Sequence, residues 1–282
     1  MDMALTDWIG RTETRADLIA PGPCAGLAAT LDRAADPPAP GTPIPPLWHW
    51  LYFLDRARSS ELGPDGHPRR GGFLPPVALP RRMWAGSRLR FHAPLCIGER
   101  VERRSTIADV VPKSGRSGDL VFVTVRHEYV RAAAAAPALT EEHDIVYRDA
   151  ARPGETPPTP TPPAGEAEWR REWRPDPVLL FRYSALTFNG HRIHYDRPYA
   201  TGVEGYPGLV VHGPLIATLL LELLRDARPE GRVTAYRFRA LRPTFDTAPF
   251  LVSGRTQPDG SVRLWAQDHE GWMTMEATAQ VG

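Results

Sequence analysis

Extended, strand-like segments separated by turn residues occur in both halves of the chain. In the first half they span 87–95, 99–112, 119–130 and 139–148. In the second half they span 231–241, 249–257, 260–268 and 271–281. Both series predict antiparallel strands, and the first series is expected to form a meander.

One segment is apolar on every side. It runs from Leu215 to Leu221 and closes on Leu223 and Leu224. Because a helix without a polar face has to be buried, we expect this one at the centre of a core. Pro214 suits its first turn and Gly213 the position just before it, so unpaired N–H groups at the helix start point towards the chain that precedes it.

The remaining elements are shorter. Residues 6–20 suit a short capped helix or an edge element, and 23–36 suit an amphipathic helix. The aromatic run LWHWLYFL at 47–54 is strand-like. Residues 59–80 are rich in Gly and Pro, which predicts a long loop over the surface or across a ligand groove.

The two halves repeat one order of elements. RFHA at 90–93 recurs as RFRA at 237–240, and each opens a series of strands. We interpret this as an internal duplication, with a half at 1–150, a proline-rich linker at 151–168 and a half at 169–282. The fold class is therefore α+β, with two curled antiparallel sheets that each wrap a helix.

Composition narrows the function classes. The 282 residues carry a formal net charge of +1 with acidic and basic residues mixed, so neither nucleic acid nor a membrane surface is expected as a partner. The two cysteines have no metal or redox spacing. The start of the chain shows no secretory signal and no apolar run could span a membrane, so we expect a cytoplasmic protein.

Polar chemistry is concentrated at 181–196, FRYSALTFNGHRIHYD. A buried strand could not satisfy so many hydrogen-bonding groups, and the stretch is therefore interpreted as an active-site loop. The apolar helix that follows offers backbone donors to this loop. Such an arrangement indicates an oxyanion stabilised beside an acid/base.

These residues resemble the motif of the MaoC-like (R)-specific enoyl-CoA hydratases. The motif places are occupied here by Tyr183, Thr187, Phe188, Asn189, Gly190, His191, Arg192, Ile193 and His194. TFNGHRIHYD, VVHGPL, DWIGRTET, LPRRMWAG and RRSTIADV are similar, over nearly the whole chain, to the branch of hydroxyacyl-thioester dehydratases and mesaconyl-C4-CoA hydratases. The resemblance implies a double hot-dog fold, with substrate binding in the first half and catalysis in the second. It also implies no cofactor.

The chain departs from the wider motif where Asp becomes Asn189, Gly becomes Phe188 and Pro becomes Arg192. An amide cannot act as a general base, so the Asp/His pair of the wider family is not carried over whole. His194 is the expected acid/base, and His191 better suits a loop tie. Asn189 either holds the reacting water and orients His194 or caps the loop. The Gly213 amide is the expected oxyanion donor, unless this glycine only relieves packing.

Further residues are candidates for substrate binding. Tyr183, Thr187 and His212 are expected to line the site, with ordinary structural roles as alternatives. Lys113 and Arg116, in the hairpin PKSGRSGD, could bind phosphate, although such a loop is more often a solvated turn. Arg192 could pair with a substrate carboxylate or with Asp196 of its own loop.

The expected reaction is water addition to, or removal from, a short-chain 2-enoyl or 3-hydroxyacyl thioester. The resemblance implies a mesaconyl-C4-CoA or itaconyl-CoA substrate that gives citramalyl-CoA. Alternatives are a general 3-hydroxyacyl-CoA or acyl carrier protein dehydratase, an acyl-CoA thioesterase and a non-enzymatic ligand carrier. We expect an acyl-CoA substrate, with an acyl carrier protein thioester as the alternative, and a homodimer. A metal held by His191, His194 and His212 is the weaker interpretation, because His-Gly-Pro fits a helix cap better.

Overall fold

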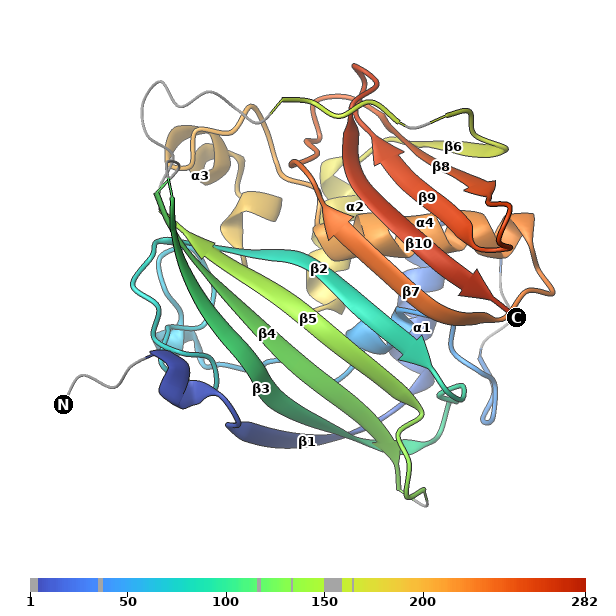
Figure 1. Cartoon of the computed structure of the whole chain (residues 1–282), viewed down its shortest axis with the longest axis horizontal. Helices are drawn as coiled ribbons and strands as arrows, with labels where there is room; N and C mark the ends of the chain where they lie inside the picture. The colour runs from blue at the N-terminus through green and yellow to red at the C-terminus, as the bar shows by residue number, and fades with distance from the viewer. Residues whose placement is uncertain (1–4, 35–37, 116–117, 133, 150–158, 164) are drawn as a thin grey trace.

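The computed structural model describes residues 5–34, 38–115, 118–132, 134–149, 159–163 and 165–282. Within these ranges one antiparallel sheet runs in the order β1-β3-β4-β5-β2-β7-β10-β9-β8-β6 (Figure 1). Its strands are β1 (Thr12–Leu18), β2 (Arg81–Phe91), β3 (Arg100–Gly115), β4 (Gly118–Arg131), β5 (Leu139–Arg148), β6 (Trp169–Trp173), β7 (Val233–Ala240), β8 (Phe250–Thr256), β9 (Val262–Gln267) and β10 (Met273–Val281).

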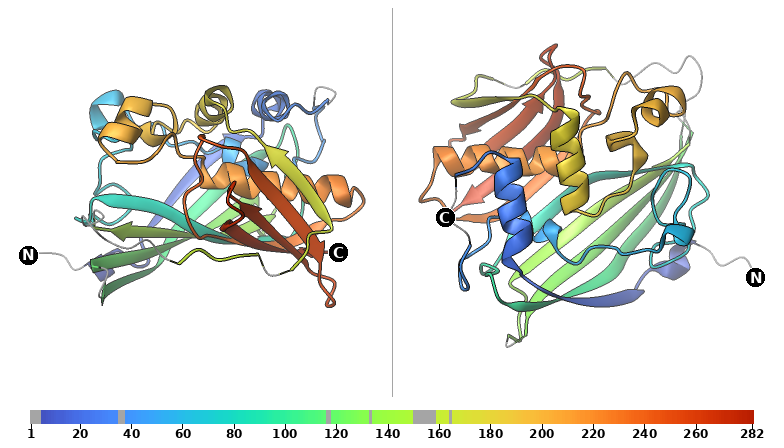
Figure 2. Two further views of the ribbon diagram at one scale, coloured as in Figure 1. Left: turned by 90° about the horizontal axis from the view of Figure 1, so that it is seen from above. Right: turned by 180° about the vertical axis from the view of Figure 1, so that it is seen from behind.

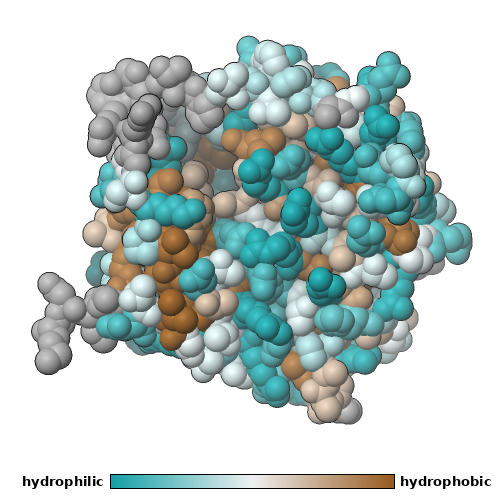
Figure 3. Space-filling model, viewed as in Figure 1, coloured by the Kyte–Doolittle hydropathy of each residue, from teal (hydrophilic) through white to brown (hydrophobic). Residues whose placement is uncertain are grey.

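The helices lie on one side of this sheet, as the two further views show (Figure 2). They are α1 (Pro21–Thr30), α2 (Pro177–Leu186), α3 (Arg197–Gly202) and α4 (Gly213–Ala227), with short 3-10 helices η1 (Leu5–Trp8), η2 (Trp48–Leu51), η3 (Ser59–Glu61) and η4 (Arg192–His194). In this part of the chain no helix is long and apolar enough to cross a membrane. The outer face of the sheet is mostly polar, with an apolar strip on the left in Figure 3.

Helix α4 forms the centre of the main core. Every residue from Leu215 to Leu224 is buried, as the apolar run predicted. The strands of the second half pack against it, while α1 and α2 lie side by side on its other flank (Figure 2). The helix is thus covered from both sides, and its first turn is held rigidly against the segment that precedes it.

The sheets of the two halves are joined into one. Strand β2 pairs with β5 of its own half and with β7 of the other half. A β-bulge between Trp84 and Gly86 accompanies this contact, and a Cβ on Gly86 would lie only 2.3 Å from the carbonyl oxygen of Phe238. Glycine is required here because the two backbones approach too closely for a side chain.

Several local predictions need correction. The first half is not a plain meander, because β2 leaves β3 and pairs with β5. Residues 47–54 contain η2 instead of a strand, and the first six residues of the predicted active-site loop belong to helix α2. Two predictions hold, because the edge element expected within 6–20 is strand β1, preceded by η1, and the helix expected within 23–36 is α1, which begins at Pro21 and ends at Thr30. Half of the predicted linker, 151–158 and 164, lies outside the described residues.

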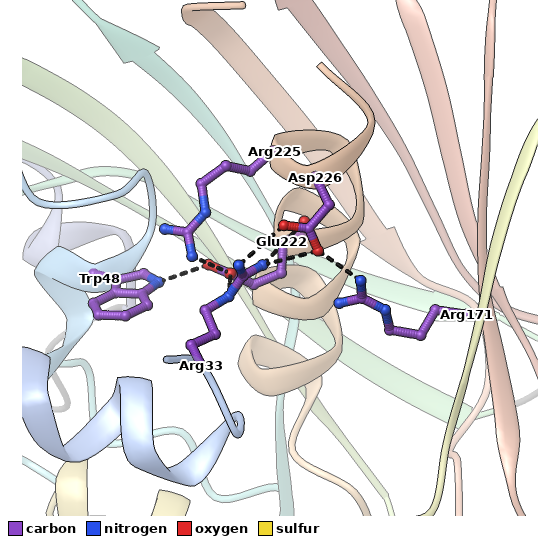
Figure 4. A network of polar contacts seen from close by, with 6 residues as sticks. All are labelled: Arg33, Trp48, Arg171, Glu222, Arg225 and Asp226. Carbon is purple, nitrogen blue, oxygen red and sulfur yellow. Dashed lines mark hydrogen bonds and ion pairs between the residues drawn. The ribbon is translucent and has the colours of Figure 1, made fainter. Parts of the chain in front are cut away.

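A polar network ties the halves together around Glu222 of α4 (Figure 4). Trp48 Nε1 and Arg225 Nη2 donate to its carboxylate over 3.0 and 2.6 Å, and Arg33 forms an ion pair with it. Arg33 also pairs with Asp226. Because Trp48 and Arg33 come from the first half, this buried carboxylate fixes that half against the central helix.

Candidate active site

The catalytic loop predicted from the sequence leaves the C-terminus of α2. Phe188 has a positive φ of 50°, which turns the chain sharply after Thr187. The loop then enters η4, and the Asp196 side chain caps α3 by accepting a hydrogen bond from the Tyr199 N–H. These two short helices hold His194 beside the segment that leads into α4.

His194 is buried and has a defined tautomer. Its Nδ1 lies 2.7 Å from the carbonyl oxygen of Val210, which can only accept, so the proton is on Nδ1 and the lone pair on Nε2. Burial lowers the pKa of His194 to about 4, because the charged imidazolium would be poorly solvated. At neutral pH the residue therefore offers a free basic nitrogen.

His212 supports the ring of His194 from behind. The two rings are stacked with centroids 3.7 Å apart, and His212 Nε2 shares a 2.8 Å hydrogen bond with Ser184 Oγ. Burial holds the pKa of His212 well below its usual range, so the stacked pair is neutral. Gly213 follows His212 directly and is the first residue of α4, so the N-terminus of this helix starts next to the stacked pair.

Asn189 closes its own loop. Its Oδ1 accepts a 3.0 Å hydrogen bond from the backbone N–H of His191, which is the loop-capping contact that the sequence left open. The amide also lines a cavity of about 600 Å³. A direct role of Asn189 in catalysis stays a prediction, as does the role of Gly213 as an oxyanion donor.

The cavity lies between the two halves. Its second-half wall includes Tyr183, Thr187, Asn189 and Pro214, so the predicted lining roles of Tyr183 and Thr187 agree with their positions. His194 itself is only 8% exposed and does not line the cavity, but its ring stacks on His212, which packs against Tyr183 of this wall. From the first half the cavity is lined by His49, Trp50, Phe53, Gly66, His67, Arg82, Trp84, Arg103, His127, Tyr129, Glu141 and His143.

Two predicted binding residues, Arg192 and Lys113, lie away from the cavity. Arg192 donates from Nε and Nη2 to Asp196 Oδ2 over 2.9 and 2.8 Å, and its guanidinium stacks 4.1 Å from the Tyr199 ring centroid. Its guanidinium thus pairs within its own loop, which is the alternative that the sequence left open for Arg192, and it does not line the cavity. Lys113 lies over the Phe122 ring and lines none of the cavities described here. Arg116 lies outside the described residues.

The first half contributes a buried polar cluster that sequence reasoning missed. Glu141 is 1% exposed and accepts hydrogen bonds from Ser87 Oγ at 2.9 Å and Trp50 Nε1 at 3.2 Å, while His49 Nε2 lies 3.3 Å away. Burial opposes its ionisation, but the hydrogen bond with His49 and the electrostatic interactions with His49, His127 and His143 together outweigh burial and keep the pKa of Glu141 below its usual range. The sequence signal that could have revealed this cluster is Glu141 itself, a carboxylate at a position of β5 whose side chain faces inward.

The loop at 59–80 reaches across to the catalytic loop, as the groove alternative predicted. His67 lies with its ring centroid 4.0 Å from that of His191 and 3.1 Å, through Nδ1, from Asp65 Oδ2. The possible ligand atoms of Asp65, His67 and His191 all lie within 4.8 Å of one another, so this trio could hold a metal ion. That site differs from the histidine trio considered from the sequence.

The fold defines the class first. A MaoC-like dehydratase structure matches with a TM-score of 0.72 at 16% identity and covers 99% of each chain. A conserved hypothetical protein from Mycobacterium tuberculosis with a double hotdog fold matches with a TM-score of 0.59 at 15% identity, over 99% of this chain and 96% of that one. The protein is therefore a double hot-dog protein, as expected.

Sequence comparison then gives the family. Residues 47–246 match the family model of hydroxyacyl-thioester dehydratase type 2, and the chain belongs to this family. It is 50% identical over 280 residues to a mesaconyl-C(4)-CoA hydratase from Chloroflexus aurantiacus, covering 98% of this chain and 97% of that one. It is 29% identical to the mitochondrial hydroxyacyl-thioester dehydratase type 2 of Schizosaccharomyces pombe, over 75% and 77% of the chains.

Proposed function

We propose that this protein is a hydro-lyase that adds water to a short-chain 2-enoyl thioester bearing a free carboxylate. Mesaconyl-C4-CoA, hydrated to citramalyl-CoA, is the substrate we favour. The observation that carries the proposal is the neutral, oriented His194, whose ring stacks on His212 directly before the first residue of α4. His194 takes a proton from water and returns it to Cα, while backbone donors at Gly213 stabilise the enolate-like thioester oxygen.

Arg82 supports a substrate with a carboxylate. It lines the cavity. Burial is the main cause of the lowered pKa of His67 and of His191, and the nearby charge of Arg82 lowers both pKa values further. A guanidinium there can form two parallel hydrogen bonds with a carboxylate next to the reacting carbons. Arg82 therefore takes over the role that the sequence suggested for Arg192.

The test is a comparison of thioesters with mass detection of the product. Wild type should hydrate mesaconyl-C4-CoA faster than crotonyl-CoA and release no free thiol, and Arg82→Met should lose mainly the former activity. Arg104→Met, at an exposed arginine of β3 that lies outside the cavity lining, is the matched arginine control. Faster turnover of crotonyl-CoA or of acyl carrier protein esters would instead indicate a general 3-hydroxyacyl-thioester dehydratase, and thiol release would indicate a thioesterase.

A further inference from the structure

The reacting water needs a second hydrogen-bond acceptor. Water has two O–H bonds, and Nε2 of His194 can accept only one of them. Part of the acceptor capacity of Asn189 is already used, because its Oδ1 accepts from the His191 N–H at 3.0 Å. An amide would in any case be a weak acceptor compared with a carboxylate or an imidazole. The following inference rests on the proposed hydro-lyase function.

A first-half segment, Pro64 to His67, is docked on the catalytic loop. The backbone N–H of Arg192 donates to the carbonyl oxygen of Asp65 at 2.9 Å, and Arg192 Nη1 donates to that of Pro64 at 3.0 Å. Arg192 is in turn held by Asp196. The segment is thus fixed by hydrogen bonds to the residue that lies two positions before His194.

Two glycines make this docking possible. Gly66 has a φ of +87°, and a Cβ on it would lie 1.9 Å from the carbonyl oxygen of Gly190. A Cβ on Gly190 would lie 2.9 Å from the carbonyl oxygen of Gly66. The two backbones are therefore in direct contact, and a side chain at Gly66 would both strain the turn and force the loops apart.

The docked segment presents an oriented imidazole. His67 Nδ1 lies 3.1 Å from Asp65 Oδ2, and since a carboxylate only accepts, Nδ1 carries the proton and Nε2 the lone pair. His67 lines the same cavity as Asn189 and Gly190, from the opposite half.

We infer that His67, oriented by Asp65, is a second catalytic residue that accepts a hydrogen bond from the water deprotonated by His194. With both hydrogens of the water held by imidazole nitrogens, its oxygen lone pair faces Cβ of the enoyl thioester. The oxygen bonds to Cβ while one proton passes to His194 Nε2, and the C=C electron pair moves towards Cα and the thioester oxygen. Cα then takes the proton from His194, so both histidines end neutral.

The same residues could serve as metal ligands, and metal binding has to be distinguished from a role in proton transfer. A metal would need the lone pairs of His67 and His191 and the Asp65 carboxylate to converge on one point. In the structure the Asp65 carboxylate lies 3.1 Å from Nδ1 of His67, a contact that orients the imidazole for proton chemistry when no metal is bound. Chelator treatment therefore belongs in the test.

The experiment compares full-length wild type, His67→Gln, Asp65→Asn and His67→Ala on mesaconyl-C4-CoA and crotonyl-CoA. His67→Gln should lower kcat about ten- to a hundredfold, the scale of one lost hydrogen bond to a reacting group, with little change in KM. Asp65→Asn should lower kcat by a smaller factor. Added imidazole should restore part of the activity of His67→Ala, which a purely structural role would not produce. His269→Gln, at an exposed turn, is the matched histidine control.

The outcomes are distinct. A folded His67→Gln or Asp65→Asn variant with kcat within twofold of wild type would overturn the inference and leave the proposed function standing. Loss of wild-type activity on chelation, restored by Zn²⁺, would also overturn it in favour of a metal at Asp65, His67 and His191. If wild type hydrates neither thioester, the proposed function itself fails and the inference with it.

Discussion

The proton on His194 is placed by one backbone contact. The Val210 carbonyl fixes Nδ1–H, and the neutral ring of His212 stacks against the imidazole without adding a charge. The sequence predicted His194 as the acid/base from its motif. It could not predict the partner of Arg192. An arginine four residues before Asp196 can form an ion pair within its loop or bind a substrate carboxylate, and only tertiary packing decides between the two.

We expect His194→Gln to reduce hydration at least about a hundredfold, the scale of one positioned acid/base, without loss of folding. Glutamine can replace the hydrogen bond to Val210 but cannot carry a proton between water and Cα. Steady-state kinetics and circular dichroism measure the two effects. His269→Gln should behave as wild type, and near-normal turnover by a folded His194→Gln would remove His194 from the mechanism.

The pH dependence follows from the low pKa of about 4 for His194. A lowered pKa means that the basic nitrogen stays unprotonated well below the ordinary histidine value of about 6.5. We therefore expect kcat/KM to stay level from pH 8 to about pH 5.5 and to fall only as the pH approaches 4. An acidic limb with its midpoint near 6.5, measured where circular dichroism shows a folded protein, would contradict this.

At the scale of elements, strands and the apolar helix were predictable but the short turns were not. Residues 47–54 read as a strand because aromatic side chains favour strands. Tertiary contacts override that preference: Leu47 has a φ of 71°, and Trp48 and Trp50 donate to Glu222 and Glu141, which holds a single 3-10 turn. Neither carboxylate is near this segment in sequence, so the local pattern contained no sign of the contacts.

Glu222→Ala should destabilise the protein by about 2–3 kcal/mol, because Arg33, Arg225 and the Trp48 N–H would lose their shared buried acceptor. The two arginines are partly exposed and can turn to water, which limits the loss. Urea unfolding measures the change. The control is Glu172→Ala, which removes an ion pair with Arg174 whose side chains are 51% and 79% exposed and should cost at most about 1 kcal/mol. Equal losses in both variants would refute the structural role of the network.

At the scale of the molecule, the duplication predicted two halves but not how they join. Alternation shows which face of a strand is buried, whereas the choice of β7 as the neighbour of β2 depends on edges that look alike in sequence. The same limit applied to the cavity. Its walls combine strands and loops of both halves, so the sequence located the second-half loop and left the polar residues of the first half unassigned.

The second half should therefore neither fold nor work alone. A fragment of residues 159–282 would expose the edge of β7 that pairs with β2 and would leave Glu222 without Trp48 and Arg33. An unpaired edge of this kind favours aggregation. The fragment would also lack the cavity wall that carries Arg82 and His67.

We expect the fragment to be insoluble or inactive when it is expressed separately. Co-expression with residues 1–150 should recover soluble protein with part of the hydratase activity, because the lost β2–β7 pairing can reform between chains. Size-exclusion chromatography and the thioester assay measure both outcomes. A soluble, fully active fragment would show that the first half is dispensable, and would place the whole hydration chemistry in the loop between α2 and α4.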